Sequence, residues 1–296
     1  MTPVKILISL ILIISVCSIS AQDDLEALLM NEMGEEVEYE FGTFISNNVL
    51  NNHSTEMTNK NGIGFRISHK FGSLKSGPAA FYGFDNAISL FEVNYAPVDW
   101  WNIGLGRSTV NESMNGYTKF RIARQSSEAK VMPVSVAMLL VANCVTTQFE
   151  DETRNNQLAE RLDYTSQLLI ARKFGKNFSA QLVPTYIHRN LVKTKADLND
   201  LVALGFGATY KIKQHFSINA EYFWVQKHNT PSTEYFNPLS VGVCYQTSRH
   251  AFELFVTNSN GITETQFLAN TTNDFLKGDV RIGFNIATVF TLKSKK

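Results

Sequence analysis

The sequence predicts an all-β protein: a closed antiparallel up-and-down transmembrane β-barrel of about 12 strands that follows an N-terminal signal peptide. Three observations support this prediction. From residue 61 onward, segments of about ten residues alternate apolar and polar side chains. The connections between these segments are short and long in turn. After the N-terminus, no segment reaches the roughly 20 apolar residues that a membrane-spanning helix needs.

The N-terminus has the pattern of a signal peptide. Lys5 supplies a positive charge, residues 6–16 form an apolar run interrupted only by serines, and small residues follow. We expect cleavage after Ala21, with Ser20 as the alternative site. Lipidation of Cys17 is less favoured, because a valine precedes this cysteine where the lipidation motif needs Gly, Ala or Ser.

The clearest strand covers residues 202–213. Every second residue from Val202 to Ile212 is apolar or aromatic, while Gly205, Gly207 and Lys211 point to the opposite face. In a membrane barrel the apolar face contacts lipid and the other face lines the lumen. The twelve expected strands span residues 62–71, 87–95, 101–109, 117–125, 133–147, 161–174, 178–188, 202–213, 216–224, 239–247, 251–258 and 280–286.

The connection lengths give an independent test, because bacterial barrels alternate short periplasmic turns with longer external loops. The short connections are 96–100, 126–132, 175–177, 214–215 and 248–250. The long ones are 72–86, 110–116, 148–160, 189–201, 228–238 and 259–278. This alternation and an even strand count predict that both termini lie in the periplasm of a Gram-negative cell.

The expected organisation is a signal peptide over 1–21, a leader over 22–60 and a barrel domain over 61–296. The leader begins with an acidic helical pattern and contains a candidate strand at 39–45. Because this strand would make the wall count odd, we interpret 22–60 as a periplasmic arm or a plug inserted in the lumen. A disordered leader is the alternative.

Composition excludes several classes of function. The 27 basic and 27 acidic residues cancel, so nucleic acid is not an expected partner. After cleavage, Cys144 and Cys244 are too few for a disulfide framework. The six histidines lack the close spacing of a metal site, and no phosphate loop, Cys-x-x-Cys pair or Gly-x-Ser-x-Gly motif is present. We therefore expect neither a metal nor a cofactor.

One stretch invites an enzymatic interpretation. His215, Ser217 and Asn219 lie on one face of a strand, and outer-membrane phospholipases use such groups on twelve-stranded barrels. Such a serine must face the bilayer, whereas here Phe216 and Ile218 occupy that face and turn Ser217 inward. The expectation is a polar lumen wall and no enzymatic activity.

Charged side chains of the opposite strand faces are the candidate lumen lining. A ring of such charges tunes a pore, but a barrel of this size is equally able to pack its interior with paired charges. We favour a plugged or salt-bridged interior over an open conducting pore. The slight basic excess predicts a preference for anionic solutes if the barrel conducts. The candidates are Arg66, Lys70, Lys119, Arg121, Asp163, Lys211, Glu221, Glu253, Asp279 and Arg281.

Aromatic residues near strand ends or on the outer faces match the girdles that membrane barrels place at the bilayer interface. These are Trp100, Trp101, Tyr117, Tyr186, Tyr210, Tyr222, Trp224 and Phe290. Ordinary packing explains any single one equally well.

Short motifs recur in a recognisable order along the chain. They include His69-Lys70-Phe71-Gly72, Tyr82-Gly83-Phe84-Asp85-Asn86, Gly104-Leu105-Gly106-Arg107-Ser108, Met132-Pro133-Val134-Ser135-Val136 and Pro184-Thr185-Tyr186-Ile187-His188-Arg189-Asn190. Residues 252–258 and 284–290 continue the series. From about residue 39 to the C-terminus the chain resembles a family of Gram-negative β-barrel proteins catalogued as a domain of unknown function. The resemblance implies a barrel in the outer membrane and no activity.

We therefore expect a passive pore or the membrane part of a transport assembly, in contact with outer-membrane lipid and with small solutes or a periplasmic partner. The alternative is a closed structural or partner-binding barrel that does not conduct. A phospholipase-like barrel enzyme ranks third.

Overall fold

The computed structural model describes residues 38–127, 131–147, 157–192, 194–227 and 229–292. The chain divides into two units, Met1–Glu38 and Tyr39–Lys296, and the architecture below is that of the second. The predicted signal peptide and the acidic start of the leader lie outside the described residues.

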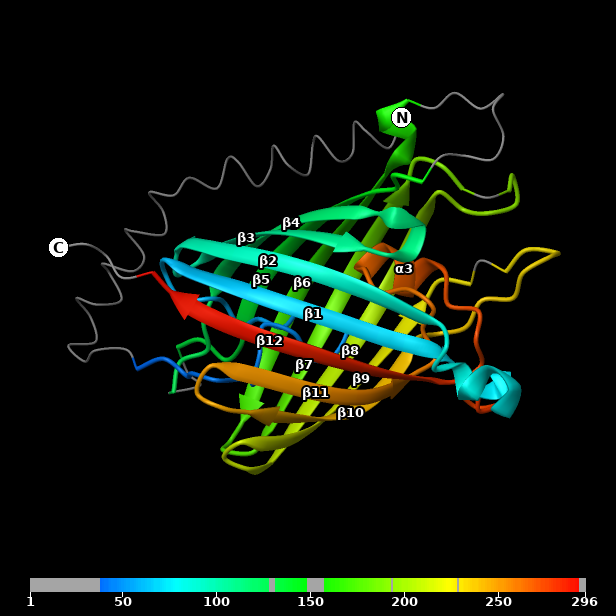
Figure 1. Ribbon diagram of the computed structural model, residues 1–296. Helices are drawn as coiled ribbons and strands as arrows, with labels where there is room; N and C mark the ends of the chain where they lie inside the picture. The colour runs from blue at the N-terminus through cyan, green and yellow to red at the C-terminus, as the bar shows by residue number, and fades with distance from the viewer. Residues whose placement is uncertain (1–37, 128–130, 148–156, 193, 228, 293–296) are drawn as a thin grey trace. The chain divides into compact units, whose positions relative to one another are not determined.

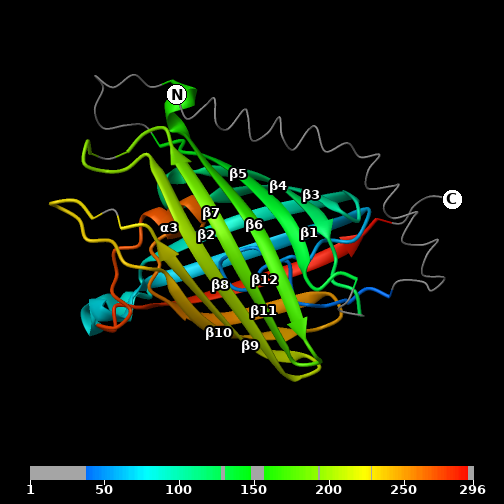
Figure 2. The same ribbon diagram turned by 180° about the vertical axis from the view of Figure 1, so that it is seen from behind.

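Twelve antiparallel strands pair in sequence order, and β1 pairs with β12 to close the barrel (Figures 1 and 2). Every predicted strand is present, so the fold prediction is confirmed; the ends differ by a few residues, as in β5, which begins two residues later than expected. The strands are β1 Gly62–Ser73, β2 Ala87–Val98, β3 Trp101–Ser108, β4 Met114–Ala123, β5 Ser135–Cys144, β6 Leu162–Phe174, β7 Phe178–Arg189, β8 Asp200–Lys213, β9 Phe216–Val225, β10 Leu239–Gln246, β11 His250–Thr257 and β12 Arg281–Thr291.

The connections sort to two ends of the barrel. At the turn end, β8 joins β9 through residues 214–215, and both β1 and β12 have a free end there. At the loop end, the longest fully described connection covers residues 258–280 and contains α3, Glu264–Ala269. Four short 3-10 helices also lie in the long connections: η1 Leu74–Ser76, η2 Pro78–Gly83, η3 Val110–Glu112 and η4 Leu158–Arg161. No helix in the described part of the chain has the length and apolar character to span a membrane.

The strands alternate between exposed apolar side chains and buried small, polar or charged ones. Phe206 is 47% exposed on the outer face, whereas its neighbours Gly205 and Gly207 are buried inside. The inner glycine makes room for a ring: a Cβ at Gly205 would lie 2.3 Å from the ring of Phe223 on the next strand. The outer face therefore has the apolar band that contacts lipid, and glycines and rings pack together on the inner face.

The aromatic assignment was wrong for Tyr117. Its ring is 5% exposed, and its hydroxyl donates a hydrogen bond to Oε1 of Glu92 at 3.3 Å inside the barrel. Tyr117 is two residues from Lys119 on β4, so the two side chains must share the inner face. Trp100, Tyr210, Trp224 and Phe290 are exposed on the outside, as a girdle requires.

Candidate functional site

Residues 42–58, called the inner segment below, lie inside the barrel. The chain approaches from the turn end, where the backbone N–H of Glu40 donates to the carbonyl of Gln125 at 2.8 Å. Two backbone hydrogen bonds then fold the inner segment into a tight hairpin, from Val49 to Asn52 and from Ser54 to Asn47, each 2.9 Å long. Val49 and its neighbours are almost completely buried. Figure 1 shows this part of the chain in blue within the wall of strands.

The hairpin tip is held by one carboxylate of the wall. Glu221 on β9 accepts hydrogen bonds from the backbone N–H groups of Leu50, Asn51 and Asn52 at 3.0, 2.8 and 3.1 Å. The side-chain amide of Asn51 adds a fourth at 3.2 Å. Successive N–H groups that converge on one anion form a nest, and hydrogen bonds to an ionised acceptor are the strong kind.

Cations and amides on other strands bind the carbonyl groups of the same segment. Arg66 on β1 and Asn285 on β12 both donate to the carbonyl of Leu50 at 2.8 Å. Lys119 on β4 donates to the carbonyls of Ser54 at 3.1 Å and of Glu56 at 2.6 Å. Arg66 and Asn285 lie on the neighbouring strands β1 and β12, but Lys119 on β4 and Glu221 on β9 lie on other parts of the wall. Because the partners surround it in this way, the inner segment occupies the lumen itself.

A second part of the chain reaches the lumen from the loop end. Residues 258–271, called the inner loop below, contain the fully buried helix α3, which begins with a capping box at Thr263. Lys70 on β1 donates to Oγ of Ser259 at 2.7 Å and to the carbonyl of Gly261 at 2.6 Å. On the far side, the Gln266 amide donates to the Ser113 hydroxyl at 2.8 Å.

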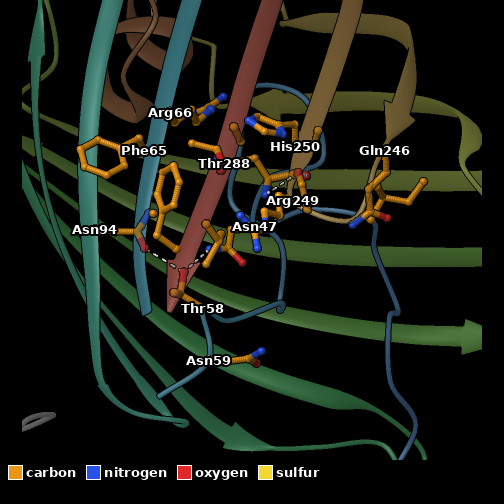
Figure 3. Close-up of a pocket in the computed structure, with 18 of the residues that line it drawn as sticks. Asn47, Thr58, Asn59, Phe65, Arg66, Asn94, Gln246, Arg249, His250 and Thr288 are labelled. Carbon is orange, nitrogen blue, oxygen red and sulfur yellow. Dashed lines mark hydrogen bonds between the residues drawn. The ribbon is translucent and has the colours of Figure 1, made fainter. Parts of the chain in front are cut away.

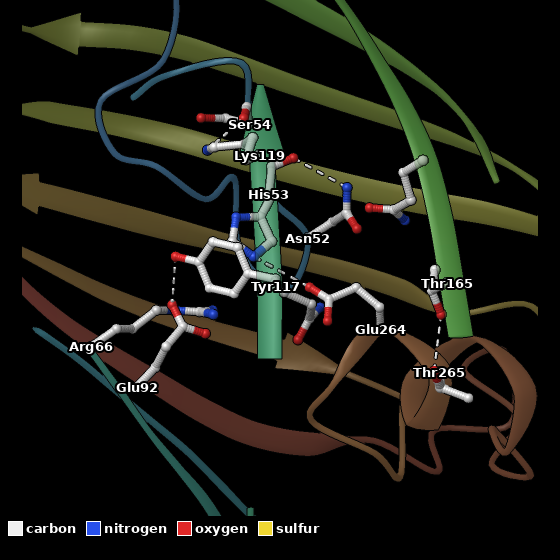
Figure 4. A network of polar contacts seen from close by, with 12 residues as sticks. Asn52, His53, Ser54, Arg66, Glu92, Tyr117, Lys119, Thr165, Glu264 and Thr265 are labelled. Atoms are coloured by element: carbon white, nitrogen blue, oxygen red, sulfur yellow. Dashed lines mark hydrogen bonds and ion pairs between the residues drawn. The ribbon is translucent and has the colours of Figure 1, made fainter. Parts of the chain in front are cut away.

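The inner segment and the inner loop meet at His53 and Glu264. Figure 4 shows the imidazole of His53 between the Tyr117 ring and the Glu264 carboxyl group; Nε2 lies 3.5 Å from Oε1 of Glu264. Burial, reinforced by the nearby cations Lys119 and Arg66, lowers the pKa of His53 well below its ordinary range. Burial raises the pKa of the Glu264 carboxyl to about 7. The contact is therefore between a neutral imidazole and a carboxyl group that titrates near neutral pH.

The ten candidate lumen residues fall into two groups. Five of them are buried in the middle of the barrel: Arg66, Lys70, Lys119, Glu221 and Glu253. Glu253 accepts from Ser46 of the inner segment at 3.1 Å and from Asn285 at 2.6 Å. Among the described residues, no ion pair joins two of these five charges, and each of the five instead contacts the inner segment or the inner loop.

The other five candidates are half-buried near the strand ends. Arg121 donates to the Asp99 carbonyl at 3.1 Å, and Arg281 to the Phe71 carbonyl at 3.3 Å. Lys211 donates to the Gly42 carbonyl at 2.7 Å. Asp163 lies opposite Arg189 on the neighbouring strand. Asp279 accepts hydrogen bonds from Ser73 and from Asn273.

Sequence reasoning missed three members of this site. Glu92 could have been identified from the sequence, because Phe91, Val93 and Tyr95 alternate with it on β2 and so predict that its carboxylate points inward. Glu264 lies between Thr263 and Gln266, which form a capping-box pattern. This pattern is a sequence signal for a helix, here within a connection that we expected to be an external loop. Nothing in the sequence around His53 signals its position, because the inner segment has no regular periodicity.

Ser217 and Asn219 face the lumen as their strand phase predicted, whereas His215 lies exposed in the turn before β9. Ser217 is buried and donates to the side-chain oxygen of Asn219 at 3.0 Å, while the Asn219 amide donates to the Val49 carbonyl at 3.0 Å. The serine hydroxyl therefore belongs to the packing of the lumen. In the described ranges, no group of three or more His, Cys, Asp or Glu side chains is placed to hold a metal ion. Both described cysteines are free thiols.

A cavity of about 520 Å³ lies between the inner segment and the wall, near the turn end. Its walls come from the inner segment, β1, β2, β12 and the β10–β11 turn (Figure 3). Thr58 lies between Asn47, whose amide donates to its hydroxyl, and Asn94, which accepts from it, both at 2.8 Å. Arg66 and Glu92 also border this space. The cavity therefore leaves unfilled space between the wall and this side of the inner segment.

Comparison with known proteins agrees with this architecture. The family model described as "Membrane bound beta barrel domain (DUF5777)" matches residues 44–290. No curated protein sequence matches the chain. The NanC porin is a similar solved structure, with a TM-score of 0.47 and 10% identity over 78% of this chain and 100% of that one. The outer membrane channel from Pseudomonas putida F1 has a TM-score of 0.46 and 10% identity over 79% of this chain and 97% of that one. The Acinetobacter baumannii outer membrane protein Omp33 has a TM-score of 0.44 and 9% identity over 79% of this chain and 100% of that one. The likeness is one of barrel fold.

Proposed function

The chain belongs to this family of membrane-bound β-barrel domains, and on that premise we propose that it is an outer-membrane pore held closed by its own inner segment. The apolar outer band contacts membrane lipid, and small polar solutes pass through the lumen when the inner segment withdraws. Both termini lie on the periplasmic side, so the inner segment withdraws in that direction.

One observation carries this proposal. The charges at the middle of the wall bind backbone groups of the inner segment, as Glu221, Arg66 and Lys119 do, and form no ion pair with one another in the described part of the chain. A barrel with no need for an open state would satisfy its interior with apolar side chains or with pairs of wall charges. Because the polar groups of this wall bind a segment that can be removed, water can replace the segment as their hydrogen-bond partner once it leaves.

The connectivity supports withdrawal as one unit. One end of the inner segment continues through residues 59–61 into β1, and the other continues into residues 39–41, where Glu40 is bound to Gln125 and Lys173 at the turn end. No strand of the wall has to break for residues 42–58 to move. Its own backbone hydrogen bonds lie within the hairpin of residues 47–54. The inner loop, in contrast, is joined to the wall at both ends, by β11 and β12, and stays in place.

The test is solute flux into liposomes that contain either the full chain or a variant lacking residues 42–58. The full chain should give slow swelling in an uncharged pentose, and the deletion variant should give fast swelling. Heat-modifiable migration in detergent gels serves as the control that both barrels are folded. Equal, fast swelling of the two proteins would contradict closure by the inner segment.

A closed structural or partner-binding barrel is the second candidate, and one observation favours it. The inner loop fills the loop end independently of the inner segment, through contacts such as Thr265 with Thr165 and Phe267 with Phe223. Under this alternative, a folded deletion variant remains impermeable because the inner loop alone blocks the path.

A further inference from the structure

We infer that the opened lumen conducts small cations in preference to anions. This inference rests on the proposed function, because it concerns the path that the inner segment vacates. The charges at the middle of the barrel that face this path after the inner segment leaves determine the preference.

Withdrawal of the inner segment releases three carboxyl groups. Glu221 loses the three backbone N–H groups of the hairpin tip, and Glu253 loses the Ser46 hydroxyl. Glu264 loses its contact with His53, which leaves with the segment. Glu92 borders the same space and accepts a hydrogen bond from Tyr117, which belongs to the wall and remains. Water that enters the lumen hydrates these groups, and hydration favours the ionised carboxylate.

Two cations face the same path. Arg66 loses the Leu50 carbonyl, and Lys119 loses the carbonyls of Ser54 and Glu56. The balance at the middle of the path is therefore four carboxylates, Glu92, Glu221, Glu253 and Glu264, against two cations, a net charge of two negative.

Lys70, the third buried cation, faces the inner loop and not the vacated path, and counting its charge as well still leaves the balance one negative. Its ammonium group donates to Ser259 and Gly261 and lies 5.9 Å from the centre of the Phe267 ring. All three partners belong to the inner loop, which stays attached to the wall at both ends. The inner loop therefore continues to cover the Lys70 charge when the inner segment leaves.

The sequence-based preference for anions came from counting all lumen candidates equally. That count omitted Glu92 and Glu264, and it included cations at the strand ends such as Arg121 and Arg281. Charges at a wide, wet mouth are screened over about 8 Å at physiological salt, whereas charges at a narrow middle act on every ion that passes. The charges at the buried middle therefore determine the ion selectivity of the opened lumen, and the solutes that it favours are inorganic cations and small amines.

The experiment measures the reversal potential of the variant lacking residues 42–58 in a planar bilayer with a KCl gradient. We expect a permeability ratio of K⁺ to Cl⁻ of about 3 or more. In the same background, replacing Glu253 and Glu264 by Gln together should bring the ratio to about 1 or below, because two carboxylates then face two cations. Lys176→Gln, in an exposed turn, is the matched charge control and should leave the ratio unchanged.

Anion preference in the conducting deletion variant would overturn the inference while leaving the proposed function intact. A folded deletion variant that does not conduct would overturn the proposed function instead. If deletion prevents insertion, the same ratio is measured on the openings of full-length Glu221→Gln, where three carboxylates still face two cations. A ratio below 1 in those openings would equally overturn the inference.

Discussion

Replacing Glu221 by Gln should release the inner segment without unfolding the barrel. The carboxylate accepts three backbone hydrogen bonds of 2.8–3.1 Å in a buried setting, and each charged hydrogen bond contributes about 1.5–3 kcal/mol. A glutamine keeps one acceptor oxygen and turns an –NH2 group toward the remaining donors. We expect a loss of about 3–4 kcal/mol in segment binding, which corresponds to a roughly 10²–10³-fold larger withdrawn population.

The assay is the rate at which a water-soluble maleimide labels Val49→Cys, in a background where Cys144 and Cys244 are replaced by Ala. Val49 is 1% exposed, so labelling reports withdrawal, and Glu221→Gln should accelerate it by the same 10²–10³-fold factor. Glu253→Gln is the matched control: it removes one hydrogen bond to the segment and should accelerate labelling about tenfold or less. A Glu221→Gln rate within twofold of the parent, in a barrel that remains heat-modifiable, would refute the assignment of Glu221 as the principal anchor.

Three further outcomes are expected. Phe206→Arg should destabilise the refolded barrel by about 2–4 kcal/mol through its lipid-facing position, whereas Gly205→Arg should act by displacing the inner aromatic ring; a lipid-borne quencher that fails to distinguish probes at the two positions would contradict the facing assignment. A cysteine at Ser232 should react with an impermeant thiol reagent on intact cells and one at Lys176 only after outer-membrane permeabilisation, and the reverse pattern would mean an inverted barrel. Burial raises the pKa of Glu264 from an ordinary 4.5 to about 7, so the protonated carboxyl group stabilises α3 fully below pH 4.5, and this stabilisation is lost as the pH rises through 7. The rate of amide exchange in α3, corrected for the intrinsic rate, should therefore rise with pH in the parent protein and stay constant in Glu264→Gln.

The wall of the barrel was predictable because period-two alternation records which face meets lipid. In β8 the exposed Phe206 and the buried Gly205 follow directly from the sequence phase. Tyr117 was misassigned only because an aromatic ring near a strand end was given more weight than the phase of Lys119 beside it. The alternation of connection lengths likewise predicted which connections share an end.

The contents of the lumen were less predictable, because neither inserted part has a periodic sequence pattern that indicates which of its faces is buried. The inner segment consists largely of Asn, Ser and Thr, which is also the composition of an exposed loop. What fixes it is a set of hydrogen bonds donated by Arg66 and Lys119 and accepted by Glu221, all from strands distant in sequence. A plug is one interpretation that the sequence of the leader allows, but no pattern in the sequence predicts these contacts or the pairing of His53 with Glu264.

The central claim is that the lumen is a polar path closed by residues 42–58. Its most direct test is single-channel recording of the deletion variant before and after a synthetic peptide of residues 42–58 is added to one chamber. We expect steady openings that the peptide blocks only from the turn side, with a weaker block when Glu221 is replaced by Gln. Openings that the peptide leaves unchanged from both sides, or an equal block of the two proteins, would contradict it.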